Sequence, residues 1–190
     1  MLYRGCRPRQ RIAPYSCAAL IAAALLSGCS LFGSSSDKTE QPAASCPTAA
    51  ILRPLSQTAV FAPGAAAQPM GVAFYGVLNE ATAKCERAGD ALRAALDVVV
   101  IGERGPAAGQ AAAVDLQYFV AVTGPDQTIL SKRSFPVSIP VAPGTRRSGV
   151  TDHIEETIPL GGRAPGDLNI IVGFQQPPDV IEFYKHFRGR

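Results

Sequence analysis

The sequence predicts a mainly β protein in which one antiparallel β-sandwich is followed by a short C-terminal helix. Between residues 69 and 174, about six or seven apolar stretches alternate with turn-forming Gly, Pro and Asp residues. Apolar residues at clear helical spacing follow only after Pro177-Pro178. Many short strands with a single helix favour two packed sheets over an alternating α/β fold.

The clearest strand covers residues 114–122, where apolar residues alternate with polar or small ones: Val114, Leu116, Tyr118, Val120 and Val122. This alternation predicts one buried and one solvent-facing side. Further strands are expected over 70–85, 92–101 and 129–141, with turns at Ala88-Gly89-Asp90 and at 124–127. Leu168, Ile170, Val172 and Phe174, with Ile171 between them, predict a central strand that is buried on both faces.

Two stretches carry features of an edge. Pro136 and Pro140 interrupt the strand at 129–141, which predicts an edge or bulged strand because proline donates no ladder hydrogen bond. The pattern over 150–160 is ambiguous, since Asp152 and Glu156 share a face with apolar residues. The whole set suggests an immunoglobulin-like sandwich architecture, although the Cys–Trp–Cys hallmark of true immunoglobulin domains is absent.

The C-terminal helix is expected over 177–187. Pro177-Pro178-Asp179 forms a suitable helix start, and four apolar residues follow at helical spacing, namely Val180, Phe183, Tyr184 and Phe187. This apolar stripe predicts that the helix docks on the sandwich. An alternative is a free helix that presents the stripe to a partner.

The first 28 residues have the pattern of a secretory signal. Four arginines precede a ten-residue apolar run, 17–26, which is too short to span a membrane. Leu26-Ser27-Gly28-Cys29 resembles the lipobox of bacterial lipoproteins. The resemblance implies removal of residues 1–28, a diacylglyceryl group on Cys29 and an N-terminal acyl chain such as palmitate. Ser30, by the pattern of enteric lipoproteins, favours the outer membrane, with the protein facing the periplasm.

Residues 29–45 are expected to be the acylated cysteine and a flexible tether, because residues 30–45 are mostly small and polar. Such a coil has a root-mean-square span of roughly 20–25 Å. Residues 46–190 then form one domain. The four signal arginines account for the net charge of +3, since the rest of the chain has 14 basic and 15 acidic residues. No basic footprint for nucleic acid remains.

Cys46 and Cys85 are the two cysteines of the predicted domain. Outside the cytoplasm such a pair is expected to form a structural disulfide. Two free buried thiols are an alternative. A redox pair is a third reading, although the close Cys-x-x-Cys spacing typical of it is absent.

Catalytic patterns are sparse. His153 lies within Asp152-His153-Ile154-Glu155-Glu156, the densest group of potential metal ligands or acid–base residues, yet no three-ligand set is evident. An edge strand with solvated charges explains the same residues. The serines lie in no nucleophile motif, and 102–109 lacks the Gly-Lys-Ser/Thr ending of a phosphate loop. Arg146-Arg147 is expected to be an exposed basic loop.

Four short elements resemble those of a group of uncharacterised bacterial lipoproteins: Cys46-Pro47, 104–108, 158–160 and 172–175. No activity, cofactor or metal comes with this resemblance. We therefore expect an envelope-anchored binding or accessory module with a protein partner, not an enzyme. One alternative is a small-ligand carrier with a pocket between the sheets. A hydrolase or metal site around His153 is a third.

Overall fold

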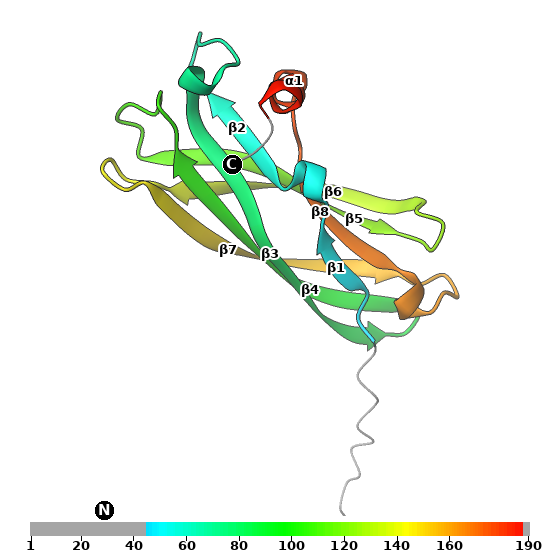
Figure 1. The fold of residues 1–190 in the computed structure, drawn as a ribbon. Helices are drawn as coiled ribbons and strands as arrows, with labels where there is room; N and C mark the ends of the chain where they lie inside the picture. Colours follow the sequence, from blue (N-terminus) through cyan, green and yellow to red (C-terminus); the bar gives the residue numbers. More distant parts are fainter. Residues whose placement is uncertain (1–44, 188–190) are drawn as a thin grey trace, which may run out of the picture. The chain divides into compact units, whose positions relative to one another are not determined.

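The computed structural model describes residues 45–187. Cys29 and the segment boundaries at 28 and 29 lie outside that range, so their assignment stays a prediction. The described chain forms two four-stranded sheets with one α-helix after the last strand (Figure 1). The strands are β1 Thr48–Ile51, β2 Gln57–Phe61, β3 Val72–Ala88, β4 Ala91–Arg104, β5 Ala113–Thr123, β6 Ile129–Pro140, β7 Arg147–Pro159 and β8 Asn169–Phe174. The helix α1 is Pro178–His186, and short 3-10 turns occur at η1 Arg53–Leu55, η2 Pro69–Gly71 and η3 Pro165–Asp167.

Sheet A has the order β1-β8-β5-β6, and sheet B has the order β2-β3-β4-β7. All neighbouring strands are antiparallel except β1 and β8, which run parallel with Thr48 opposite Asn169. The predicted mainly β sandwich with a short C-terminal helix is confirmed. The β2-β3-β4 meander gives the sheets a strand order of their own, different from the ABED and CFG sheets of immunoglobulin domains.

The core lies between the two sheets. Sheet A contributes the inward residues of β5 and β8, and sheet B those of β3 and β4. The largest fully buried side chains include Tyr118, Phe174, Leu92, Leu96 and Ile170. These positions follow the two-residue period of each strand, which explains why the apolar alternation in the sequence located the strands.

β5 departs from its sequence pattern in its second half. The outward-facing Phe119, Ala121 and Thr123 are buried, so this half has no wet face. Phe119 packs under η1, and the ammonium group of Lys132 lies 4.2 Å from its ring centroid. The burial comes from segments distant in sequence, and alternation within β5 therefore could not reveal it.

The edge strands account for the two irregular patterns. β6 is the outer strand of sheet A, as its prolines predicted, and β7 is the outer strand of sheet B. On β7, Asp152 and Glu156 stand on the same face as the buried Ile158, next to the sandwich edge. Charged side chains that point inward at an edge strand discourage pairing with another chain.

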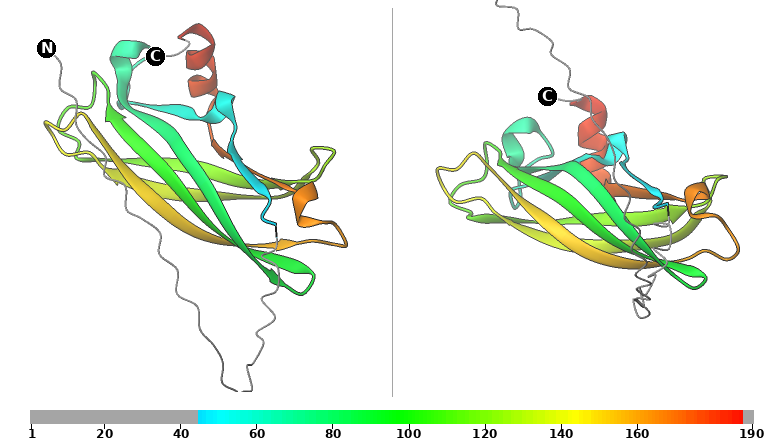
Figure 2. Two further views of the ribbon diagram at one scale, coloured as in Figure 1. Left: turned by 60° about the horizontal axis from the view of Figure 1, so that its bottom comes forward. Right: turned by 90° about the horizontal axis from the view of Figure 1, so that it is seen from below.

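The connections gather at two ends of the sandwich (Figures 1 and 2). The β3–β4, β5–β6 and β7–β8 connections lie at one end, together with the start of β1, and we call it the tether end because residue 45 lies there. The β2–β3, β4–β5 and β6–β7 connections lie at the other end, which we call the distal end. Gly89 turns the β3–β4 hairpin with a positive φ of 64°, a conformation that favours glycine.

Candidate functional site

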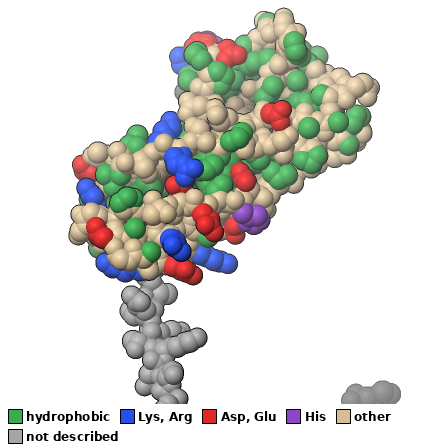
Figure 3. Space-filling view, turned by 180° about the vertical axis from the view of Figure 1, so that it is seen from behind, with side chains coloured by type: hydrophobic (Ala, Val, Ile, Leu, Met, Phe, Trp, Pro, Cys, Tyr) green, Lys and Arg blue, Asp and Glu red, His purple; other side chains and the backbone are tan. Residues whose placement is uncertain are grey.

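The two ends of the sandwich differ in charge. The distal connections 62–71 and 105–112 contain only Ala, Pro, Gly, Gln and Met, and 141–146 consists of Val, Ala, Pro, Gly and Thr followed by Arg146. The tether-end connections instead carry Asp90, Asp126, Arg163 and Asp167. Figure 3 shows one face of the molecule, on which charged side chains gather over the half nearer the grey chain and are scarce over the other half. The distal connections are therefore built mostly of small uncharged side chains, and Arg146, whose side chain is 80% exposed, is their one charged residue.

Arg104 ties two of the distal connections, 105–112 and 141–146, together. Its guanidinium lies over the Phe74 ring and donates hydrogen bonds to the carbonyl oxygens of Gly109, Ala111 and Val141. A charged donor that spans three carbonyls holds the loop backbones more firmly than neutral contacts alone. The sequence contained no sign of this role, because the acceptors are backbone atoms up to 37 positions away.

Backbone contacts complete this bracing. The amide of Gly105 donates to the carbonyl of Ala73 at 2.7 Å, and the amide of Val141 donates to that of Ala112 at 2.8 Å. A Cβ at position 105 would lie 2.3 Å from the carbonyl oxygen of Val72, so the close approach of the two loops requires glycine. The expected strand exit at 102–109 is thus present and packed on the start of β3.

Helix α1 packs on the outer face of sheet B beside the distal end. Val180 and Phe183 are buried, and Phe183 forms an edge-to-face pair with Phe61 of β2, with centroids 5.4 Å apart. Ala59 and Val72 complete this small apolar cluster. The predicted docking of the helix is present, but Phe187 keeps 43% of its surface exposed. The apolar stripe of α1 is therefore buried at Val180 and Phe183, whereas Phe187 at its end stays partly exposed to solvent.

A groove of about 440 Å³ runs between α1 and the outer face of sheet B. Its lining combines aromatic, apolar and polar groups: Gln57, Pro69, Tyr75, Gly76, Val77, Glu103, Arg147, Phe183, Tyr184 and Phe187. Burial raises the pKa of the Tyr184 hydroxyl to about 12, and the nearby Tyr75 adds to this effect. The Tyr184 hydroxyl thus stays neutral at physiological pH.

Two charged residues, Glu103 and Arg147, line the groove. Glu103 on β4 lies between Tyr75 on β3 and Arg147 on β7 in one cross-strand row. Its carboxylate accepts hydrogen bonds from the guanidinium of Arg146 at 3.1 and 3.3 Å. Arg147 makes no side-chain hydrogen bond or ion pair with any other residue of the described range 45–187. Of the two arginines in the expected basic loop, Arg146 thus pairs with Glu103, and Arg147 has no side-chain partner within residues 45–187.

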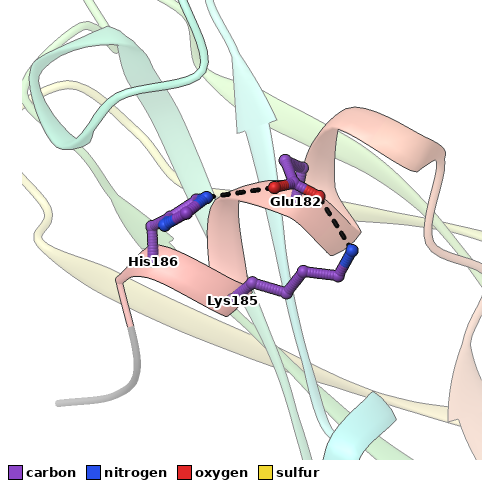
Figure 4. Close-up of polar contacts among 3 residues, drawn as sticks. All are labelled: Glu182, Lys185 and His186. Carbon is purple, nitrogen blue, oxygen red and sulfur yellow. Dashed lines mark hydrogen bonds and ion pairs between the residues drawn. The ribbon is translucent and has the colours of Figure 1, made fainter.

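The outward face of α1 carries a small polar cluster (Figure 4). Glu182 accepts hydrogen bonds from the ammonium of Lys185 at 2.8 Å and from His186 Nε2 at 3.0 Å. These hydrogen bonds lower the pKa of Glu182. All three side chains are exposed, and pairs at this spacing support a helix by only a few tenths of a kcal/mol. The cluster supports the helix and offers no buried site.

His153 lies on the outer face of sheet B, away from the groove. Its Nδ1 is 2.6 Å from a carboxylate oxygen of Asp97, its cross-strand neighbour on β4, and its side chain is 74% exposed. Within residues 45–187, no three ligand-type side chains gather in one place. The structure thus brings one carboxylate to His153 and supplies no third partner. Asp152 and Glu156 point to the opposite face.

The two domain cysteines are joined. Cys46 and Cys85 form a disulfide with their Cα atoms 5.2 Å apart, which links the first described residues to β3. The disulfide predicted from the sequence between these two cysteines is confirmed. The sequence left open a ligand pocket between the two sheets. The groove described above lies elsewhere, on the outer face of sheet B. The groove has no signal in the sequence, since its lining comes from six separate elements.

The described chain is thus a two-sheet β-sandwich with a distal end of mostly small uncharged side chains and a helix-walled groove. No family model matches the chain, and no curated protein or solved structure is significantly similar to it. None of the helices within residues 45–187 combines the length and apolar character needed to cross a membrane.

Proposed function

We propose that this protein is a lipid-anchored, non-catalytic module of the bacterial cell envelope that holds a protein partner at its distal end. The lipobox-like Leu26-Ser27-Gly28-Cys29 supports the anchor. The observation that carries the partner site is the charge-poor surface formed by the three distal connections, in which Arg146 is the one charged residue. Interface cores are depleted of charged residues, because a charge that leaves water without a partner costs free energy.

The composition of these connections suits contact with another protein. Ala, Gly and Pro lose little side-chain entropy on burial, and they allow a partner backbone to approach closely. Met70, which lies in η2 and is 75% exposed, adds a flexible apolar side chain of a kind enriched at interfaces. The bracing by Arg104 keeps the loops ordered, so binding requires little further ordering.

The direction of the anchor also supports the proposal. Residue 45 lies at the tether end, so an acylated Cys29 would be attached opposite the distal connections. A partner that binds the distal end then meets no obstruction from the membrane that holds the anchor. With a tether span of roughly 20–25 Å, the distal end would project away from the bilayer.

Site-specific photocrosslinking in cells tests the partner site. A photoreactive residue at Met70 or Ala107 should give a discrete higher-mass adduct, because both positions lie on distal connections. Ala164 and Gly166, which are exposed on the β7–β8 connection, are controls at the opposite end and should give none. Equal adducts from both ends, or none from the distal end, would contradict a distal partner site.

Substitution of the lipobox cysteine tests the anchor separately. Cys29→Ala should leave the precursor uncut or release a soluble form, since the thiol that accepts the lipid is gone. Membrane fractionation and intact mass measure the two outcomes. A processed Cys29→Ala protein that still fractionates with membranes would rule out acylation at Cys29 as the anchor.

A further inference from the structure

We propose that the groove between α1 and sheet B binds a single-chain anionic amphiphile, of the chemical class of a free fatty acid. The alkyl chain lies along the aromatic floor, and the carboxylate pairs with Arg147. This ligand site goes beyond the partner surface proposed above and shares only Pro69 with it.

The size and lining of the groove carry the first part of the argument. A volume of about 440 Å³ falls within the range of sites that bind small molecules. Four aromatic rings line it, contributed by Tyr75 of β3 and by Phe183, Tyr184 and Phe187 at the C-terminal end of the chain. The ring centroids of Phe183 and Phe187 lie 5.1 Å apart, yet 43% of the surface of Phe187 is exposed to solvent. An alkyl chain in the groove would cover apolar surface that is now open to water.

The charges at the groove carry the second part. Arg146 neutralises Glu103, while Arg147 has no partner within residues 45–187, so this row of sheet B carries one uncompensated positive charge. A guanidinium presents paired donors that match a carboxylate. The combination of one cation with an aromatic floor fits a ligand that has one anionic head and an apolar body. A polyanion or a sugar would leave either its charges or its hydroxyls unpaired in this groove.

Binding of amphiphiles with equal chains and different heads tests the proposal on the purified full-length protein. Isothermal titration below the critical micelle concentration would compare dodecanoate, dodecyltrimethylammonium and dodecyl maltoside. Dodecanoate should bind at least tenfold more tightly than the other two. Decanoate should bind more weakly than dodecanoate, by about three- to fourfold for each methylene fully removed from water. Equal affinity for the three heads, or no binding of dodecanoate, would overturn the proposal.

Charge reversal locates the head group. Arg147→Glu should weaken dodecanoate binding at least tenfold and leave the maltoside unchanged. Arg93→Glu is the matched control, because Arg93 is also exposed and faces outward on sheet B, at the tether end. Unfolding curves of both variants would exclude loss of the fold. An unchanged affinity in Arg147→Glu, or equal losses in both variants, would refute this site. Photocrosslinking at the distal end is independent of each of these outcomes.

Discussion

At the scale of single residues, a hydrogen bond between Tyr118 and Asp152 links the two sheets. The hydroxyl of Tyr118 on β5 donates to a carboxylate oxygen of Asp152 on β7 at 2.7 Å. Tyr118 is fully buried, and its burial, followed by the bond to Asp152, raises the pKa of the hydroxyl well above its usual range. The neutral hydroxyl thus remains a donor at every physiological pH. This pair explains why an acidic residue occupies the inner face of β7.

Tyr118→Phe should destabilise the protein by about 1.5–3 kcal/mol, because it removes a hydrogen bond to a charged acceptor and leaves that carboxylate partly buried. The midpoint and slope of urea unfolding measure this loss. A double-mutant cycle with Asp152→Ala isolates the pair, and the coupling should be favourable. Losses that simply add in the double variant would show that the bond contributes nothing to stability.

The alkaline limit of stability should depend on Tyr184. A tyrosine in the unfolded chain ionises near pH 10, whereas the folded-state pKa of Tyr184 is about 12. Below pH 10 both states are neutral and this stabilisation is complete. Between pH 10 and about 12 the unfolded state alone releases the proton, so the free energy of unfolding falls as pH rises. Unfolding at about pH 9 and about pH 11 checks this slope, which should be smaller in Tyr184→Phe.

At the scale of elements, α1 depends on its contact with sheet B. A helix of nine residues is marginal alone in water, so its order comes from packing of Val180 and Phe183 on β2 and β3. The same contact forms one wall of the groove. A stable α1 is therefore a condition for ligand binding there.

Phe183→Ala should cost about 2–4 kcal/mol, because it opens a cavity in the small apolar cluster under α1. Ile181→Ala is the matched control on the same helix. Ile181 is 44% exposed, so its loss should change stability by no more than about 0.5 kcal/mol. Thermal unfolding measures both variants.

Hydrogen exchange tests the docking of α1 directly. Amides over 181–187 should be protected, and truncation after Gln176 should destabilise or aggregate the protein by exposing Ala59, Phe61 and Val72. Exchange at random-coil rates across α1 would favour the alternative of a free helix that awaits a partner.

At the scale of the whole molecule, the disulfide determines where the chain enters the sandwich. β1 pairs with β8 over only four residues, and the Cys46–Cys85 bond adds a covalent link between this start and sheet B. Any pull through the preceding chain is thus passed to both sheets. The distal end stays free of this load because it lies at the other end of the strands.

Replacing both Cys46 and Cys85 with serine should lower the free energy of unfolding by about 2–4 kcal/mol, since the unfolded chain loses a constraint across 39 positions. Denaturant unfolding with and without reductant measures this change, and reductant should have no effect on the double variant. Two alkylatable thiols in the native protein, isolated without reductant, would contradict the disulfide.

Sequence alone determined the fold class because local periodicity reports burial. The strict alternation over 114–122, the prolines of β6 and the run 168–174 placed three strands of sheet A, and helical spacing placed α1. The compartment implied by the signal made Cys46 and Cys85 a pair. The short strands β1 and β2 escaped, because four or five residues hold too little of the two-residue pattern.

Only the tertiary structure decided what covers each face and which segments meet. The burial of Phe119, the reach of Arg104 to three loop carbonyls and the inward turn of Asp152 all depend on partners far away in the sequence. The groove likewise depends on packing between distant segments. Only when β3, β4, β7 and α1 pack together does Arg147 lie beside the aromatic side chains that line the groove. Periodicity describes one element at a time, whereas a binding surface arises from the packing between elements.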